Sequence, residues 1–451
     1  MTATVADDEV PPVSRPLSTR PVQRASADGA QQLRIAGGSK LIGTASVGGA
    51  KNAALPIMAS ALLTGEPCVI HNIPWIDDID TLSRVLRSLG ARVEFLPDHT
   101  VVVAADALSS TRAPADLVRK MRASFLVMGP LLARFGCAEA AQPGGCDIGI
   151  RPVNVDIEGF RDMGAAVVSS DEAYRVECDR LHGTEIYLDY PSHTGTENLL
   201  MAACLADGET VIKHASTEPE VVDLAQFLSS LGARIDGAGT STIVVRGVSK
   251  LHGSEYTVMP DRLIAGTYVA AAAITGGDIT VERIIPDHLD AVIYKLQKIG
   301  ATVSVRDDSL RVCTQGPMHS VDIQAIHYPG FPTDLQAVFG ALLTQAQGLS
   351  TIQERVFENR LGYADELKHM GAAIEVEGQT ARVYGPTALH GAPIRALDVR
   401  AGAAVILAAL AADGCSILSD AQVVSRGYED LVEVLQGFGA SISWAEPELP
   451  C

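Results

Sequence analysis

The stretch Leu89-Gly90-Ala91-Arg92-Val93-Glu94-Phe95 joins two kinds of hydrophobic pattern. Before it, apolar residues at positions 82, 85, 86 and 89 fall on one face of an expected helix. After it, residues 92–95 alternate between polar and apolar side chains, which is typical of a half-buried strand. Gly90 stands where many helices end in a left-handed glycine. The stretch therefore predicts a hinge between a helix and a strand.

The same hinge, an apolar residue followed by Gly-Ala, occurs six times. Its glycines recur at intervals of 74, 68, 68, 71 and 68 residues, as Gly90, Gly164, Gly232, Gly300, Gly371 and Gly439. The repeating units also contain helical stretches of almost only small and apolar residues, as at 53–63, 198–205, 269–274 and 403–411. Helices that are apolar all round must be buried in a domain interior.

Six units of roughly 70 residues predict an α/β fold of two domains, each with three repeats, sheets outside and helices inside. The alternative, a solenoid, fits less well because its usual repeats have roughly 20 to 50 residues. The active site of such a pair of domains is expected in the cleft between them.

The composition indicates a globular protein. The chain has 451 residues, 47% of them hydrophobic, which is enough for two or three domains.

A formal charge of -19 argues against a nucleic-acid partner, and no apolar run is long enough for membrane insertion. Residues 1–30 lack the apolar segment of a secretory signal and are expected to be a disordered extension. Eight scattered cysteines without a CxxC pair suit a reducing cytoplasm, where we expect the protein to reside.

A glycine-rich loop carries the most reactive candidate side chain. The stretch Pro143-Gly144-Gly145-Cys146-Asp147-Ile148-Gly149-Ile150-Arg151-Pro152 places a thiol five residues before an arginine. Glycines permit a mobile loop, and nearby positive charge lowers the pKa of a thiol. Cys146 is therefore a candidate acid or nucleophile. Taken alone, it equally fits a small buried hydrophobe, as most free cysteines are.

Several longer motifs resemble those of the enolpyruvyl transferase family, and the resemblance covers about residues 33–444. Besides the cysteine loop, the motifs are Gly49-Ala50-Lys51-Asn52-Ala53-Ala54-Leu55-Pro56, Met121-Arg122-Ala123-Ser124, Phe331-Pro332-Thr333-Asp334, Phe357-Glu358-Asn359-Arg360, Asp398-Val399-Arg400-Ala401 and Arg426-Gly427-Tyr428-Glu429. The resemblance implies two inside-out α/β barrel (prism) domains. It assigns residues 31–50 plus 260–451 to one split domain, and 51–259 to a second domain that carries the cysteine loop.

The resemblance also implies a donor, phosphoenolpyruvate, and residues to bind it. Both substrates of the family are anionic, so the cleft needs fixed cations. Lys51, Arg151 and Arg426 are implied as ligands of the phosphate, and Arg360 and Arg400 as a fork around the carboxylate, which suits planar guanidinium groups. Asn52 and Glu358 are implied as orienting groups. Taken one at a time, each arginine also fits a surface ion pair.

The implied reaction is addition followed by elimination through a tetrahedral intermediate, with release of phosphate. Cys146 matches the family's proton donor, which also forms a covalent adduct with phosphoenolpyruvate. Asp334 matches the residue that takes the proton of the acceptor hydroxyl, as a carboxylate can with a suitable pKa. A second role for Asp334, capping the helix that begins near Leu335, is compatible with the first.

The acceptor implied by the family is a uridine nucleotide. The implied contacts are Arg122, Pro152, Val153, Asn154, Val155, Ser192, His193, Asp334 and Val356. Three departures from the family pattern lie near them: Asp156 replaces a usual histidine, His193 replaces the valine of the family's Ser-Val-Gly-Ala-Thr, and Ser425 replaces a usual aspartate. A negative charge at Asp156 opposes a diphosphate if the side chain faces it. We hypothesise that His193 supplies the positive charge lost at 156.

Three functions therefore stay open. The first is transfer of the enolpyruvyl group to the 3-hydroxyl of UDP-N-acetylglucosamine. This reaction begins peptidoglycan synthesis, and the enzymes that catalyse it are targets of fosfomycin. The second is transfer to another uridine nucleotide such as UMP, as in nucleoside antibiotic biosynthesis. The third is a non-catalytic paralogue that binds a sugar nucleotide; retention of both Cys146 and Asp334 speaks against it.

No metal or cofactor is predicted, because the sequence has no paired histidine ligands, Walker A loop or GxGxxG motif. Oligomeric state is left open.

Overall fold

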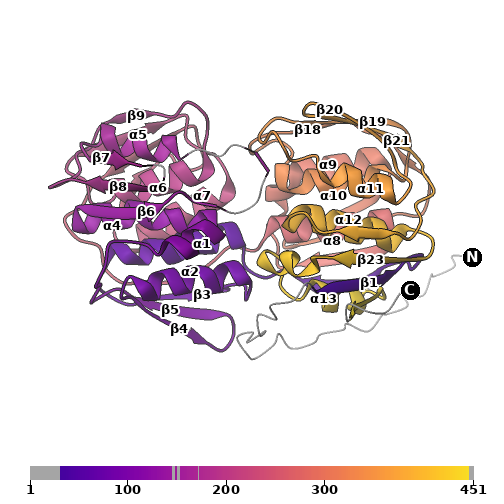
Figure 1. Cartoon of the computed structure of the whole chain (residues 1–451), viewed down its shortest axis with the longest axis horizontal. Helices are drawn as coiled ribbons and strands as arrows, with labels where there is room; N and C mark the ends of the chain where they lie inside the picture. Colours follow the sequence, from indigo (N-terminus) through magenta and orange to yellow (C-terminus); the bar gives the residue numbers. More distant parts are fainter. Residues whose placement is uncertain (1–30, 145–147, 150–152, 171, 446–451) are drawn as a thin grey trace, which may run out of the picture.

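A computed structural model describes residues 31–144, 148–149, 153–170 and 172–445. Two lobes lie side by side (Figure 1), each around its own hydrophobic core. The core of one lobe is drawn from residues between Ala50 and Met259, and we call it the inserted lobe. The other core combines Leu33–Val47 with Leu263–Ile442, and we call it the split lobe. The exact domain boundaries stay a prediction.

The inserted lobe has three sheets, with strand orders β13-β3-β5-β4, β6-β8-β7 and β11-β12-β10-β9. Its strands are β3 (Cys68–His71), β4 (Arg92–Leu96), β5 (Thr100–Ala104), β6 (Cys137–Ala141), β7 (Ala166–Ser169), β8 (Ala173–Glu177), β9 (Glu185–Tyr187), β10 (Glu209–Lys213), β11 (Arg234–Asp236), β12 (Thr242–Arg246) and β13 (Glu255–Thr257). Its helices are α1 (Lys51–Ser60), α2 (Asp77–Ser88), α3 (Ala115–Lys120), α4 (Met128–Phe135), α5 (Asn154–Asp162), α6 (His193–Ala203) and α7 (Pro219–Ser230), with 3-10 turns η1 (Ala61–Leu63) and η2 (Arg122–Val127).

The split lobe also has three sheets, β22-β23-β1-β24, β15-β16-β14-β2 and β17-β19-β21-β20, the last with β18 beside β19. Its strands are β1 (Gln32–Ala36), β2 (Ile42–Ser46), β14 (Asp278–Glu282), β15 (Thr302–Arg306), β16 (Ser309–Cys313), β17 (Met318–His319), β18 (Ile323–Ala325), β19 (Ala346–Glu354), β20 (Ala373–Glu377), β21 (Thr380–Gly385), β22 (Pro393–Arg395), β23 (Cys415–Ser419) and β24 (Ser441–Ala445). Its helices are α8 (Arg262–Ile274), α9 (Asp290–Ile299), α10 (Thr333–Leu343), α11 (Tyr363–His369), α12 (Val399–Ala411) and α13 (Leu431–Gly437), with η3 (Pro286–Leu289) and η4 (Ala421–Arg426).

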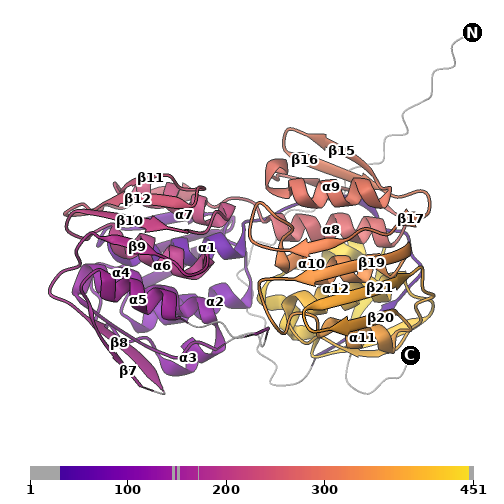
Figure 2. The same ribbon diagram turned by 90° about the horizontal axis from the view of Figure 1, so that it is seen from above.

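Helices occupy the inside of each lobe and sheets the outside, as the apolar helices predicted (Figures 1 and 2). In the split lobe α8, α10 and α12 pack against one another and are buried along almost their whole length. In the inserted lobe α4 and α6 pack together beside α1, itself buried from Ala53 onward. The prediction of two α/β domains with sheets outside is confirmed.

The six Gly-Ala hinges share one backbone geometry. All six glycines have positive φ, between 94° and 102°. At the first hinge the Ala91 N–H donates to the Leu86 carbonyl at 3.0 Å, and the other five hinges repeat this bond at 2.9–3.0 Å. This six-residue closure satisfies carbonyls left open at a helix end, which is why glycine stands there.

The start of the described chain is part of the split lobe. β1, drawn in indigo, lies among the C-terminal elements in Figure 1 and pairs antiparallel with both β23 and β24. β2 pairs in parallel with β14. The chain then enters the inserted lobe at α1 and returns at α8, so two connections run between the lobes. Among the described residues no helix is both long and apolar enough to cross a membrane.

Candidate active site

Four of the donor-binding cations predicted from the sequence are described by the structure, and they lie where the lobes meet, mostly at helix ends. Lys51 opens α1 of the inserted lobe, whereas Arg400 is the second residue of α12 in the split lobe. Arg426 closes η4, and Arg360 lies between β19 and α11. Asp334 is the second residue of α10. Helix N-termini carry partial positive charge, which adds to that of the side chains.

Asp334 sits between the two arginines predicted to bind the carboxylate of the donor. Its Oδ1 accepts a hydrogen bond from Arg360 Nη2, and its Oδ2 lies 3.4 Å from Arg400 Nη2. Both arginine side chains are 5% exposed, whereas Asp334 is 24% exposed and can be reached from solvent. Although burial favours its protonated form, Arg360, Arg400 and Lys51 hold the pKa of Asp334 far below its usual range. Without substrate, Asp334 is therefore ionised and weakly basic.

The Arg400 guanidinium has one hydrogen-bond donor that is not used among the described residues. The guanidinium lies over the ring of Tyr428, 5.2 Å from the centroid. Its Nη1 is buried without a hydrogen-bond partner among the described residues. A buried donor without a partner is costly, so Nη1 is available to donate a hydrogen bond to a ligand.

A second carboxylate, Asp78 of α2, joins the two cations predicted to bind the phosphate. Asp78 Oδ2 lies 3.2 Å from Lys51 Nζ, and Asp78 Oδ1 accepts from Arg426 Nε at 3.0 Å. The Asp78–Arg426 pair crosses between the lobes. Next to it, Ser425 Oγ lies 2.7 Å from Asp77 Oδ2, a contact that an aspartate at 425 would replace with repulsion. The sequence analysis missed Asp78, because it belongs to an acidic helix start that looks ordinary.

The cysteine loop reaches the split lobe through its described residues. Cys146, Arg151 and Pro152 lie outside the described residues, so their predicted roles stay predictions. The carbonyl of Ile148 accepts from the Asn359 N–H at 3.1 Å. A Cβ at Gly149 would lie 2.9 Å from the backbone nitrogen of Glu358, and Gly149 has a φ of +135°, so glycine is strongly favoured there. This segment therefore lies against the Glu358-Asn359-Arg360 turn, close to Asp334.

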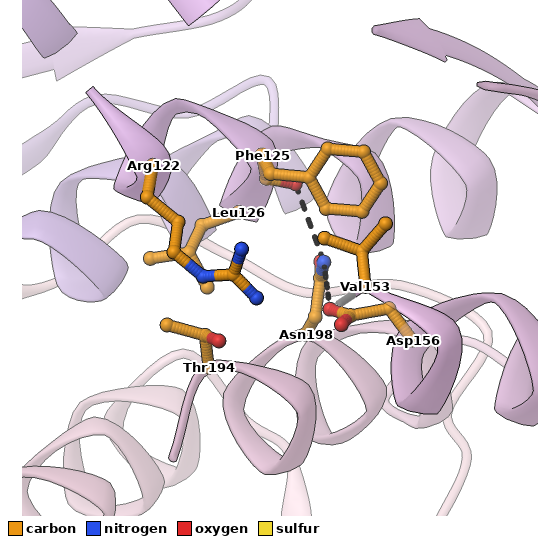
Figure 3. Close-up of a pocket in the computed structure, with 7 residues that line it drawn as sticks. All are labelled: Arg122, Phe125, Leu126, Val153, Asp156, Thr194 and Asn198. Carbon is orange, nitrogen blue, oxygen red and sulfur yellow. Dashed lines mark hydrogen bonds between the residues drawn. The ribbon is translucent and has the colours of Figure 1, made fainter. Parts of the chain in front are cut away.

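The acceptor residues predicted in the inserted lobe gather at the starts of α5 and α6. Val153 precedes α5, and Asn154 and Val155 are its first two residues. Ser192 caps α6, where its Oγ accepts from the Gly195 N–H at 3.1 Å. A small pocket opens between these helices and η2 (Figure 3), and its lining residues are Arg122, Phe125, Leu126, Val153, Asp156, Thr194 and Asn198.

Asp156 lies in this pocket and is almost fully buried, with 2% of its surface exposed. Its Oδ1 accepts from Asn198 Nδ2 at 2.8 Å. Burial raises the pKa of Asp156 to about 6, against the opposing effects of Asn198 and Arg122. Burial also lowers the pKa of Arg122, which Asp156 and Tyr190 partly offset.

The other predicted acceptor residues are more dispersed. His193 Nε2 lies 3.0 Å from Glu197 Oε1, and although burial disfavours its charge, Glu197, Glu220 and Glu218 raise the pKa of His193 to about 10. His193 is thus paired with Glu197 next to the pocket residue Thr194, and its replacement of the charge lost at 156 stays a prediction. Val356 lies in the split lobe, where its N–H donates to Glu354 Oε1 at 2.8 Å. Asn52 is half-buried beside Lys51.

A buried ion cluster at the junction of the lobes was also missed by the sequence analysis. Arg262, the first residue of α8, donates through Nε to Glu220 Oε1 at 3.0 Å and through Nη2 to Glu218 Oε2 at 2.5 Å. Glu218 Oε1 accepts from the N–H of Tyr328 in the split lobe at 3.0 Å. No group of three or more His, Cys, Asp or Glu suited to a metal ion occurs within the described part of the chain.

Comparisons with known proteins agree with this geometry. The family model of EPSP synthase (3-phosphoshikimate 1-carboxyvinyltransferase) matches residues 35–435. A UDP-N-acetylglucosamine 1-carboxyvinyltransferase of Finegoldia magna is 46% identical over 411 residues, 90% of this chain and 97% of that protein. UDP-N-acetylglucosamine 1-carboxyvinyltransferase 2 of Carboxydothermus hydrogenoformans is 47% identical over 414 residues, 91% of this chain and 99% of that protein. The structure of the enolpyruvyl transferase NikO from Streptomyces tendae superposes with a TM-score of 0.84 at 28% identity, covering 92% of this chain and 99% of that one.

An inside-out pair of α/β lobes with arginines and a lysine at their junction defines the class, a carboxyvinyl (enolpyruvyl) transferase. Within that class, the chain belongs to the EPSP synthase family. Its curated relatives at 46–47% identity are matched over nearly their full length.

Proposed function

We propose that this protein transfers the enolpyruvyl group of phosphoenolpyruvate to the 3-hydroxyl of UDP-N-acetylglucosamine and releases phosphate. The observation that carries the proposal is the pair of carboxylate-bridged cation sites, Lys51–Asp78–Arg426 and Arg360–Asp334–Arg400. Phosphoenolpyruvate has two anionic groups, one for each site. Curated relatives named for this acceptor match most of the chain.

Donor binding couples directly to activation of the base. The carboxylate of phosphoenolpyruvate takes hydrogen bonds from Arg360 and from the unpartnered Nη1 of Arg400. Asp334 then shares these arginines with a second anion, which weakens their hold on it. Its pKa rises toward the ordinary value for a carboxylate, and Asp334 becomes able to accept the proton of the acceptor hydroxyl.

The chemical steps balance as follows. The acceptor oxygen attacks C2 of phosphoenolpyruvate, its proton passes to Asp334, and Cys146 gives a proton to the C3 methylene group. The resulting tetrahedral intermediate then returns a proton from C3 to the Cys146 thiolate and loses phosphate from C2, which restores the double bond. Asp334 releases its proton to solvent as the products leave. Lys51 and Arg426 neutralise the phosphate as it leaves.

The biological setting belongs to the proposal. Transfer to UDP-N-acetylglucosamine is the first committed step of peptidoglycan synthesis, and so serves cell-wall growth, cell shape and division. Its substrates are metabolites of the cytoplasm, where we place the protein. Fosfomycin, which alkylates the thiol at the position of Cys146, is the expected inhibitor.

A coupled assay of phosphate release tests the function. With phosphoenolpyruvate and UDP-N-acetylglucosamine, the protein should release phosphate at a rate proportional to enzyme. UMP is the comparison acceptor, because the second candidate function is transfer to a different uridine nucleotide and the negative charge of Asp156 opposes a diphosphate. Turnover with UMP and none with UDP-N-acetylglucosamine would refute the proposal in favour of that candidate.

A further inference from the structure

The acceptor pocket contains a carboxylate that the proposed reaction does not use. Asp156 is the third residue of α5 and faces the same small pocket as the Arg122 guanidinium (Figure 3). Phe125, Leu126 and Val153 supply apolar walls around the two charges. An ionised carboxylate is an unexpected feature beside a cation that is proposed to bind a diphosphate.

Asn198 fixes which oxygen of Asp156 can carry a proton. Asn198 Oδ1 accepts from the Gly129 N–H at 2.7 Å, while Nδ2 donates to the Phe125 carbonyl at 3.2 Å and to Asp156 Oδ1 at 2.8 Å. These partners hold the amide in one orientation, because a flipped amide would lose the bonds from Gly129 and to Phe125. Asp156 Oδ1 must then remain an acceptor, so a proton on this carboxyl sits on Oδ2.

We propose that Asp156 is an acceptor-binding residue that takes up one proton when the diphosphate of the nucleotide sugar binds. The proton comes from solvent and resides on Oδ2, so that Asp156 changes from an opposing anion to a neutral hydrogen-bond donor. This inference rests on the proposed function, because it requires a phosphate-bearing acceptor beside Arg122.

The charges around Asp156 suit this exchange. Burial already raises its pKa to about 6, so protonation at neutral pH needs only the additional negative charge of the ligand. The other ionisable groups that act on it are Arg122 of η2, Tyr190 before α6, and Glu197 of α6, which is paired with His193. The diphosphate of a UDP-sugar is a diester that does not titrate near neutral pH, so it contributes no proton change of its own.

Proton uptake by Asp156 makes acceptor binding depend on pH. Asp156 is protonated below about pH 6 in the free protein, and binding raises its pKa further. Affinity for the acceptor is therefore greatest below pH 6. It falls as pH rises, by roughly tenfold between pH 6 and 8, as each binding event must take a proton from an increasingly basic solution.

Calorimetry of UDP-N-acetylglucosamine binding to the full chain, without phosphoenolpyruvate, tests the proposal. Titrations at pH 7 in PIPES and in Tris, whose ionisation enthalpies differ, give the number of protons exchanged. We expect uptake of roughly 0.5 to 1 proton per acceptor for the wild type and near zero for Asp156→Asn. Asp156→Asn should also bind more tightly than the wild type at pH 8. Glu158→Gln is the matched control, because Glu158 is an exposed carboxylate of the same helix, paired with Arg161, and should keep the wild-type proton uptake.

The outcomes separate the two proposals. A wild-type protein that binds and turns over UDP-N-acetylglucosamine without proton uptake overturns the role of Asp156, whatever the behaviour of the variants. Equal uptake in the wild type and Asp156→Asn assigns the proton to another group and overturns it as well. A wild type that neither binds nor turns over this acceptor overturns the proposed function, and this inference with it.

Discussion

Replacement of Arg400 by lysine tests how the site distinguishes phosphoenolpyruvate from other anions. Arg400 is 5% exposed, contacts Asp334 through Nη2, and has a buried Nη1 without a partner among the described residues. Lysine keeps the positive charge but has one nitrogen in place of the forked guanidinium. The lysine ammonium group can donate a hydrogen bond to Asp334 or to the donor carboxylate, but not to both with good geometry.

The expected magnitude follows from the bond that is lost. A hydrogen bond to a charged group contributes about 1.5–3 kcal/mol, and about 1.4 kcal/mol corresponds to a factor of ten. Arg400→Lys should therefore lower kcat/KM for phosphoenolpyruvate roughly 10- to 150-fold. The loss should appear mainly in KM for the donor, because the interaction is made when the donor binds.

Steady-state phosphate release, with phosphoenolpyruvate varied at saturating acceptor, measures the effect. Arg395→Lys is the matched control: Arg395 is an exposed arginine of the same lobe, paired with Asp420, and its replacement should leave KM unchanged. Circular dichroism checks that both variants are folded. A folded Arg400→Lys protein with a donor KM within about threefold of the wild type would refute the assignment of Arg400 to the donor carboxylate.

Three further predictions address the base, the lobe junction and the thiol. Asp334→Asn should lower kcat by roughly 10²- to 10⁴-fold, measured as phosphate release, since it removes the proton acceptor; a kcat near the wild-type value would assign the base elsewhere. Arg262→Met should lower the free energy of unfolding by about 3–5 kcal/mol in urea denaturation, because it leaves the carboxylates of Glu218 and Glu220 at the lobe junction without their cation. Arg246→Met, at an exposed ion pair, should cost less than about 1 kcal/mol, and equal losses would contradict the special role of the buried cluster. Fosfomycin should add mass at Cys146 and leave Cys146→Ala unlabelled; labelling of Cys137 or Cys204 instead would contradict the loop assignment.

Much of the fold was predictable because its signals are local. The Gly-Ala hinges require positive φ, and the apolar helices require burial, whatever surrounds them. The partners of β1 were not predictable from pattern, because Gln32–Ala36 pairs with strands that lie almost the whole chain away. Only the resemblance to a family supplied that crossover.

The family motifs mark the cations of the proposed site and one bridging carboxylate, Asp334, whereas the other bridging carboxylate, Asp78, was not predictable. Lys51, Arg360 and Arg400 lie in long motifs, so the family pattern marks them. Asp78 lies among other acidic residues at the start of α2, where carboxylates are common because they stabilise the helix N-terminus. Its importance comes from contact with Arg426 across the lobes, which spacing along the chain does not reveal.

These bridging carboxylates explain how a chain with a formal charge of -19 can present a site for an anionic donor. Each cation pair is held in place by one carboxylate, so the buried guanidinium groups of Arg360 and Arg400 and the partly buried Lys51 and Arg426 do not face one another without compensation. Two cations and one carboxylate leave each group with one positive charge. In the proposed mode of binding, phosphoenolpyruvate brings a phosphate for one group and a carboxylate for the other. Because Asp334 is both a bridge and the proposed base, donor binding changes the pKa of the residue that must act next. In the proposed mechanism, the electrostatics of the ligand-free site therefore link donor binding to catalysis. Arg360, Arg400 and Lys51 keep the pKa of Asp334 low, so Asp334 is expected to be too weak a base until a donor carboxylate competes for the two arginines.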